Sequence, residues 1–409
     1  MKLLDVIYEG WGEHWQLGTL ADAGRTLLFE YSAEAHRQGL ELSPHGLPLQ
    51  GPAFQGFPTH QWRLPGLIAD ALPDGWGLLL MDRLFRKRGL RPETLSPLDR
   101  LAFIGDRGMG ALSFRPADDI DPGEDDLSLL QLAQEAQEVV HDHDTEALQT
   151  LARLGGSPHG ARPKVLVHFD PRSQSLGTHP FVGAEPWLVK FQAGNEHPEV
   201  CAIELLYSRM ANAFGIEMPQ THLFALSDTL SAFGIRRFDR TDGLRVPTLT
   251  MAGALDVDFR EPAVGYDVLL KLTRMLTRSQ VEVDKAYRRA VFNVAFHNRD
   301  DHCKNISFRL DAARRWQLGP AYDLTFSSGP GGEHHMDICG EGRDVTRAHL
   351  LRLAKEGDVD AGFASACIDE TCELTEAFES MAAVLPIRAE TRRELVRAIR
   401  RTTGSLRAR

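Results

Sequence analysis

Long apolar runs are missing from this sequence. No stretch approaches the ~20 consecutive apolar residues that a helix needs to cross a membrane. The first residues include an acid at Asp5, where a secretory signal would have its apolar core. The five cysteines are an odd number with no Cys-x-x-Cys pair, which favours free thiols in a reducing compartment over a disulfide framework or a zinc site. We therefore expect a soluble cytoplasmic protein without a membrane partner.

An excess of positive charge is also absent. The 57 acidic residues outnumber the 46 lysines and arginines, so the formal net charge is −11. A chain of this charge is not expected to bind nucleic acid over its whole surface. Its 409 residues, 43% hydrophobic and 25% charged, describe an ordinary globular protein long enough for two or three domains.

Several local patterns predict how the chain is organised. Residues 3–31 alternate between apolar and polar positions with glycine turns, which predicts a small β-meander. Apolar residues recur at helical spacing from Trp76 to Phe85. Residues 116–126 contain six acids and two prolines, which favours a domain boundary, with an acidic docking patch as the alternative. The chain is mostly helical after residue 246 and ends in an arginine-rich helix, either a solvated face or a contact for phosphates or an acidic partner.

One segment of the second half carries a spacing that protein kinases use. Asp300 is followed five residues later by Asn305, and Asp323 comes after a predicted hairpin. In kinases these residue types are the base that accepts the hydroxyl proton and the oxygen ligands of magnesium, a hard cation. Asp300 is then the base, Asn305 and Asp323 are the Mg²⁺ ligands, and Lys304 or His302 faces the transferred phosphate. The alternative is a polar turn between a helix and a hairpin.

Two further stretches suit a nucleotide. Residues 154–164 form a glycine-rich loop whose backbone N–H groups could approach phosphates, or merely the entry to a hairpin. Lys190 stands in the apolar strand 187–191, where kinases place a phosphate-binding lysine, although a solvated edge lysine is the alternative. Glu199, at the inward edge of an amphipathic helix over 199–214, is the candidate to pair with Lys190, and Glu204 is the second choice. Either acid could instead favour the helix N-terminus.

The stretch 230–240 is predicted to be a strand that leaves into a linker. In a kinase this is the hinge that contacts adenine, which makes Arg236 and Phe238 candidates for base contacts. A core strand with a charged end explains the pattern equally well. His334 and His335 lack further ligands at a recognisable spacing, so we do not predict a metal site there.

Taken together, these motifs resemble those of the HipA family of bacterial serine/threonine kinase toxins, over nearly the whole chain. The matching stretches are Leu72-Pro-Asp-Gly75, Gly105-Asp-Arg-Gly-Met-Gly-Ala-Leu112, Ser157-Pro-His-Gly-Ala-Arg-Pro-Lys164, Arg237-Phe-Asp-Arg240, Asp300-Asp-His-Cys-Lys-Asn305 and Leu318-Gly-Pro-Ala-Tyr-Asp-Leu324. Arg162 and Pro163 depart from the family's glycine-rich loop, and Pro163 removes one N–H donor from it.

The resemblance implies an α+β fold with a bilobed, protein-kinase-like core, a helical C-terminal lobe and a small β-rich N-terminal subdomain. The corresponding segments are residues 1–116, an acidic linker 117–126, a nucleotide-binding lobe 127–245 and a catalytic lobe 246–409. It implies ATP and Mg²⁺ as cofactors, with Gly160, Ala161 and Lys164 of the loop beside the nucleotide. It also implies autophosphorylation at Ser157, where about two added negative charges would expel the loop.

The resemblance further implies a small helix-turn-helix antitoxin of HipB type, with operator DNA bound mainly through that antitoxin. Family substrates include aminoacyl-tRNA synthetases, so a protein of translation is the expected target. Two alternatives stay open, a small-molecule phosphotransferase and a pseudokinase that regulates by binding alone.

Overall fold

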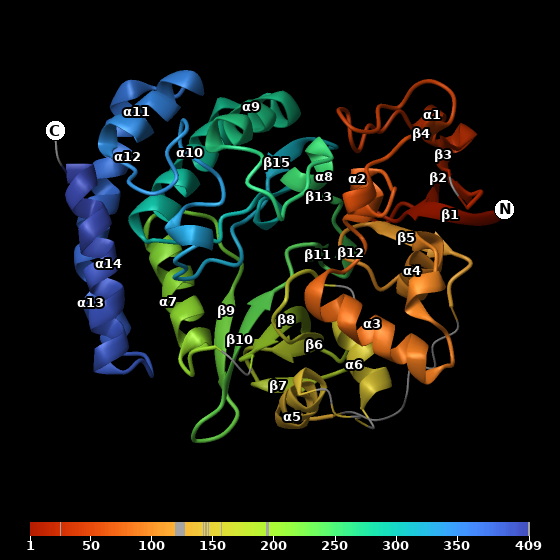
Figure 1. Cartoon of the computed structure of the whole chain (residues 1–409), viewed down its shortest axis with the longest axis horizontal. Coiled ribbons are helices and arrows are strands. Elements are labelled where there is room, and N and C mark those ends of the chain that lie inside the picture. The colour runs from red at the N-terminus through yellow and green to blue at the C-terminus, as the bar shows by residue number, and fades with distance from the viewer. Residues whose placement is uncertain are drawn as a thin grey trace. The chain divides into compact units, whose positions relative to one another are not determined.

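The computed structural model describes residues 1–24, 26–118, 127–141, 143, 145, 147–156, 158–193 and 196–407, and its helices and strands are drawn in Figure 1. The chain divides into two compact units. The sheet unit comprises Met1–Pro198, His222–Leu249 and Gly253–Asp256, and the helical unit comprises Glu199–Thr221, Thr250–Ala252 and Val257–Arg409. The predicted boundaries at residues 116–126 and 245 stay predictions, and most of the acidic run lies outside the described residues.

The sheet unit begins with an antiparallel sheet of strand order β4-β3-β2-β1-β5. Leu4, Val6 and Tyr8 of its first strand are buried at every second position, because alternate side chains of a strand face the same side. The strands are β1 (Lys2–Tyr8), β2 (Trp15–Asp22), β3 (Leu27–Tyr31), β4 (Phe54–Gln55) and β5 (Leu112–Arg115). The meander predicted for residues 3–31 is therefore confirmed.

Helices connect and cover these strands. They are α1 (Ala33–Gln38), η1 (Thr59–Gln61), α2 (Gly66–Ala69), α3 (Gly75–Lys87), η2 (Pro92–Thr94) and α4 (Pro97–Ile104). The helical spacing between Trp76 and Phe85 is confirmed as α3, which buries both residues. Helix α4 begins with a capping box, in which Ser96 and Asp99 satisfy each other's backbone N–H groups.

A second sheet of order β7-β6-β8-β10-β9 completes the sheet unit. Strand β8 lies in its middle, and the strand predicted at residues 230–240 is β10, an interior strand beside β8. The elements are α5 (Leu129–Val140), α6 (Leu148–Gly155), β6 (Lys164–Asp170), β7 (Ser175–Gly177), β8 (Glu185–Phe191), β9 (Thr221–Ala225), β10 (Ser231–Arg236), β11 (Arg240–Thr241) and β12 (Leu244–Arg245).

The helical unit contains α7, a β-hairpin and the helices of the chain's last third (Figure 1). Its elements are α7 (Val200–Ala213), α9 (Tyr266–Thr277), α10 (Gln280–Ala295), η3 (Cys303–Asn305), β14 (Ser307–Leu310), β15 (Trp316–Leu318), η4 (Pro330–Gly332), α11 (Arg347–Glu356), α12 (Ala361–Leu374), η5 (Thr375–Ala377), α13 (Phe378–Ala383) and α14 (Ala389–Arg407). Strand β13 (Thr248–Thr250) and helix α8 (Met251–Leu255) are divided between the two units.

Helix α10 positions the loop that carries Asp300. The residues of its last three turns are mostly buried, and Phe296 at its end stacks on Phe292 with ring centroids 4.5 Å apart. The hydroxyl of Tyr207 on α7 donates a hydrogen bond to the Phe296 carbonyl. The chain therefore leaves α10 from a fixed point. In the described part of the chain, no helix has both the length and the apolar character needed to cross a membrane.

Candidate active site

The loop after α10 exposes one aspartate between two buried neighbours. The side chain of Asp300 is 54% exposed, whereas Arg299 is 9% and Asp301 2% exposed. A carboxylate that accepts a proton from a substrate must be accessible to it, and the residues on either side must hold the backbone in place.

Asp301 is held by four donors from two other segments, the start of α9 and residues 334–336. Its Oδ2 accepts from the Tyr266 hydroxyl at 2.7 Å and from His334 Nδ1 at 2.8 Å. Its Oδ1 accepts from the backbone N–H groups of His335 at 2.8 Å and Met336 at 3.5 Å. Burial alone would raise the pKa of Asp301, but His334 and these hydrogen bonds hold that pKa below its usual value.

The network continues into the start of the loop. The Asn293 amide donates to the Tyr266 hydroxyl at 2.8 Å, and the Asn298 amide donates to Asn293 Oδ1 at 3.0 Å. Asn298 itself forms a parallel β-bridge with Ser327. Sequence reasoning missed this network, although its signals were present: an asparagine in the buried last turn of α10, a second just after the helix, and the Asp300–Asp301 pair.

Arg299 is anchored to the same later segment. Its guanidinium donates to the carbonyls of Gly332 and Arg343, the latter at 2.8 Å, and its backbone N–H donates to the Ser327 carbonyl. Residues 327–343 thus hold both neighbours of Asp300. The loop presents Asp300 to solvent on a fixed backbone.

The other predicted residues of this loop lie close to Asp300. His302 Nε2 is 4.0 Å from Asp300 Oδ1, and Asn305 Nδ2 donates to the Asp300 carbonyl at 2.9 Å. Lys304 Nζ lies 4.7 Å from the centre of the Phe259 ring. The loop therefore brings His302 and Asn305 to Asp300, while the structure places Lys304 over an aromatic face.

Asp323 follows the predicted hairpin β14–β15, which is confirmed by its antiparallel register. The Tyr322 hydroxyl donates to the Lys304 carbonyl at 2.9 Å, so the Asp323 segment contacts the loop of Asp300. Asp323 has a φ of 56°, a left-handed conformation that non-glycine residues rarely adopt and that often marks functional sites. Among the described residues no group of three or more His, Cys, Asp or Glu side chains could hold a metal ion.

In the sheet unit, the two predicted lysines lie side by side on neighbouring strands. Lys190 on β8 and Lys164 on β6 are register partners, and partners in an antiparallel pair point to the same face. Both are buried, at 6% and 2% exposure. Lys190 Nζ lies 5.9 Å from the Phe233 ring centre, and Lys164 Nζ donates to the His159 carbonyl.

The glycine-rich loop packs against the start of α3. The Gly160 N–H donates to Asp74, the Trp76 N–H donates to the Gly160 carbonyl at 3.1 Å, and Gly160 has a φ of 97°, which favours glycine. The Leu72–Gly75 motif therefore supports this loop. Ala161 is exposed, and Ser157 lies outside the described residues. Contacts of this loop with a nucleotide stay a prediction.

The Arg237–Arg240 motif has a structural use that the sequence did not indicate. Asp239 is 1% exposed and accepts from Arg237 at 2.7 and 2.9 Å, from Arg240 at 2.7 Å and from the Gly110 N–H at 2.9 Å. Burial alone would raise the pKa of Asp239, but the two guanidiniums hold it well below its usual range. The two residues predicted to contact adenine are in other surroundings than Asp239. Phe238 is half-buried, and Arg236 pairs at the surface with Glu185 at 2.9 Å.

We expect Asp239→Asn to lower the free energy of unfolding by about 2 kcal/mol, because it removes the charge that two buried guanidiniums require. Urea denaturation measures this change. Glu185→Gln is the matched control, since it breaks an exposed ion pair worth less than about 1 kcal/mol. Equal effects of the two variants would contradict the structural role of Asp239.

Glu199 is the N-cap residue of α7 and is 7% exposed. It accepts hydrogen bonds from Arg388 Nε at 2.9 Å and from the Thr391 hydroxyl at 2.7 Å. These contacts connect the start of α7 with the start of α14. The predicted pairing of Glu199 with Lys190 stays a prediction.

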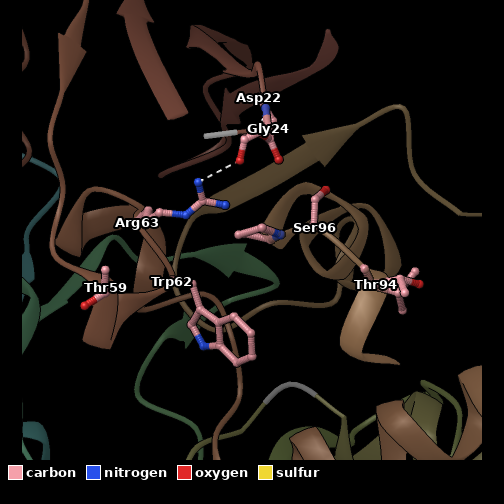
Figure 2. Close-up of a pocket in the computed structure, with 9 residues that line it drawn as sticks. Asp22, Gly24, Thr59, Trp62, Arg63, Thr94 and Ser96 are labelled. Atoms are coloured by element: carbon pink, nitrogen blue, oxygen red, sulfur yellow. Dashed lines mark hydrogen bonds between the residues drawn. The ribbon is translucent and has the colours of Figure 1, made fainter. Parts of the chain in front are cut away.

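A cavity of about 420 Å³ lies elsewhere in the sheet unit (Figure 2). Trp62, Arg63, Asp22 and Ser96 contribute to its lining, and Arg63 donates to the Gly24 carbonyl at 3.0 Å. None of the residues predicted for phosphate transfer lines it. It is therefore separate from the candidate active site.

Comparisons with known proteins give the chain's family. The HipA N-terminal domain model matches residues 5–115, and the HipA-like C-terminal domain model matches residues 156–381. A chain of the Shewanella oneidensis MR-1 toxin–antitoxin complex of HipA, HipB and operator DNA aligns with a TM-score of 0.72 and 17% identity, over 98% of this chain and 96% of that chain. This similarity confirms the α+β fold class.

A second solved structure, the Helicobacter pylori proinflammatory kinase CtkA, aligns with a TM-score of 0.39 and 12% identity, over 55% of this chain and 86% of that chain. That score is too low to indicate a shared fold. No curated protein sequence matches the chain. The C-terminal model alone matches more than half of the residues, and the chain belongs to the HipA family.

Proposed function

We propose that this protein is an ATP-dependent serine/threonine protein kinase, the toxin of a HipA/HipB-like pair. The observation that supports this most is the exposed Asp300 between anchored neighbours, with Asn305 hydrogen-bonded to its carbonyl. A carboxylate held in this way can accept the proton of a substrate hydroxyl. The spacing and the geometry both suit the catalytic loop of a kinase.

The helical unit offers donors that suit magnesium. Asn305 uses its amide nitrogen for the Asp300 carbonyl, which leaves its amide oxygen for a cation. Asp323 supplies a carboxylate from the adjoining segment, and both are the hard oxygen ligands that Mg²⁺ prefers. Bound magnesium would supply positive charge that neutralises the phosphates of ATP. These two side chains alone would not complete the coordination of Mg²⁺, and oxygens of ATP would supply further ligands, as is usual for this cation.

The sheet unit offers a site of positive charge. Lys190 and Lys164 lie on one face of two neighbouring strands, both buried. A face with two ammonium groups is chemically suited to contact phosphate oxygens through charge-assisted hydrogen bonds. We propose that Lys190 contacts the ATP phosphates and that Lys164 orders the glycine-rich loop through the His159 carbonyl.

We expect Lys190→Met to weaken Mg·ATP binding at least tenfold, about 1.4 kcal/mol, because it removes a buried cation from the phosphates. Isothermal titration calorimetry measures this affinity. Lys271→Met is the matched control, because Lys271 is exposed and pairs with Asp267 on its own helix. Unchanged affinity in Lys190→Met would contradict the assignment.

Family membership and the composition of the Shewanella complex support a proposal for the partners. We propose a helix-turn-helix antitoxin of HipB type, with operator DNA bound mainly through it. The proposed substrate is a protein of translation, such as an aminoacyl-tRNA synthetase. Autophosphorylation at Ser157 is part of the same proposal.

Expression of the wild type and of Asn305→Ala in bacteria tests this function, with growth and the phosphoproteome as the readouts. We expect the wild type to arrest growth and to add phosphoserine to a translation protein, and the variant to do neither. Arrest without any new phosphoprotein would favour a small-molecule phosphotransferase. Arrest by both proteins would favour a regulator that acts by binding.

A further inference from the structure

Helix α10 holds the chain just before Asp323 at two places. Glu282 and Arg289, here called the α10 clamp, lie on one face of the helix, about two turns apart. Glu282 Oε2 accepts a hydrogen bond from the backbone N–H of Leu318 at 2.8 Å, and Arg289 Nη2 donates to the carbonyl of Gly319 at 2.8 Å. The clamp therefore fixes both ends of the Leu318–Gly319 dipeptide.

Both side chains of the clamp are buried, at 7% exposure for Glu282 and 4% for Arg289. Burial lowers the pKa of Arg289 to about 10, so the guanidinium stays charged at neutral pH. Among the described residues its Nε and Nη1 have no hydrogen-bond acceptor. A buried guanidinium with N–H groups left unsatisfied costs free energy. A gain in stability therefore does not explain why an arginine stands at this position.

The backbone that follows the clamp carries its restraint to Asp323. The ring of Pro320 fixes φ directly after Gly319. The N–H of Ala321 then donates to the Glu217 carbonyl at 2.8 Å. The chain has little freedom between the clamp and Asp323, which has a left-handed φ of 56°. A shift of Gly319 would therefore move Asp323.

The same helix leads into the loop that presents Asp300. Helix α10 ends at Ala295, and the loop follows it. The helix thus connects the proposed base, beyond its C-terminal end, with the proposed metal ligand, through the clamp. Phosphate transfer needs these groups in a fixed relative geometry, because a misplacement of ~1 Å can lower the rate by about 10²-fold.

We propose that Glu282 and Arg289 are positioning residues, which set the place of Asp323 relative to Asp300 and thereby its affinity for the divalent cation. The proposal rests on the proposed function, in which Asp323 is a ligand of Mg²⁺. Neither clamp residue contacts the cation in this arrangement, and each acts through the backbone that it holds. Groups that orient metal ligands typically contribute about 10- to 100-fold to metal affinity.

The test measures Mn²⁺ binding to the 409-residue chain with a non-hydrolysable ATP analogue, and electron paramagnetic resonance reports the free Mn²⁺. Arg289→Met keeps the apolar stem and removes the hydrogen bond, so it should weaken Mn²⁺ binding about tenfold. Arg289→Lys can still donate to the carbonyl and should restore part of the loss. Tyr287→Phe is the matched control, because it removes a buried hydrogen bond from α10 to the Leu350 carbonyl. It should bind Mn²⁺ like the wild type.

Glu282→Ala tests the other half of the clamp and should also weaken Mn²⁺ binding about tenfold. Kinetics separate positioning from a general loss of structure. In Arg289→Met the Mg²⁺ concentration for half-maximal phosphorylation should rise about tenfold, while kcat at saturating Mg²⁺ stays within about twofold of the wild type. The urea midpoint of Arg289→Met should fall no further than that of Tyr287→Phe. A lower kcat with unchanged Mn²⁺ affinity would overturn the proposal.

Asp323→Ala distinguishes this proposal from the proposed function. If Asp323→Ala loses Mn²⁺ binding while folded Arg289→Met and Glu282→Ala keep it, the clamp has no positioning role and the kinase assignment stands. If Asp323→Ala binds Mn²⁺ as well as the wild type does, Asp323 is not a ligand. The positioning role and the metal assignment then both fail.

Discussion

Asp300→Asn should lower the rate of phosphate transfer by about 10²- to 10⁴-fold, the usual contribution of a general base. The effect should fall on kcat and leave the affinity for Mg·ATP within a factor of about two, because the nucleotide contacts are assigned to other residues. Asp300 is 54% exposed, so the substitution should cost little stability. Steady-state kinetics with a protein substrate measure kcat and KM separately.

Asp228→Asn is the control for this experiment. Asp228 is also exposed and lies in the turn between β9 and β10 of the sheet unit, so its loss should leave kcat unchanged. A normal kcat in Asp300→Asn would mean that another group accepts the proton. If the loss of kcat accompanies unfolding, Asp300 would instead be required for the stability of the fold.

Asp301→Ala should have the largest effect on stability, lowering the free energy of unfolding by about 3–5 kcal/mol. The substitution leaves the Tyr266 hydroxyl and His334 Nδ1 without their buried acceptor. Asp301→Asn should lower the free energy of unfolding by less than Asp301→Ala does. It should still be destabilising, because its amide hydrogens would point at one of these donors. Urea denaturation followed by tryptophan fluorescence measures both variants.

The pH dependence of this loss has a definite sign. The folded protein holds the pKa of Asp301 below the ordinary value, which is about 3.9 for an aspartate of an unfolded chain. Its contribution to stability is therefore fully present above about pH 4 and is lost as the pH falls through the lower folded pKa. Wild-type stability should decline toward acid more steeply than that of Asp301→Ala. Parallel declines would contradict a charged Asp301 in the native state.

Local periodicity explains why so many elements could be predicted from the sequence. Helix α7, expected at residues 199–214, spans Val200–Ala213 with Glu199 and Phe214 as its caps. The meander and the β14–β15 hairpin follow from alternation and turns in the same way. These patterns are contained within single segments, so they need no knowledge of distant contacts.

The supports of the candidate site could not be predicted, because their partners are far apart in the sequence. Asp301 depends on Tyr266 and His334, which lie 35 and 33 residues away. Asp239 accepts from the N–H of Gly110, 129 residues earlier. The spacing indicated that Asp300, Asn305 and Asp323 are candidate catalytic or metal-binding residues. It could not tell that Asp300 is exposed and its neighbour Asp301 is buried.

The most direct test of the kinase assignment is transfer of labelled γ-phosphate from ATP to serine by the purified 409-residue chain. We expect labelled phosphoserine from the wild type with Mg²⁺, and none when EDTA removes the metal or when Asp323 is replaced by alanine. Equal labelling by Asp323→Ala, or by the wild type in EDTA, would contradict the account.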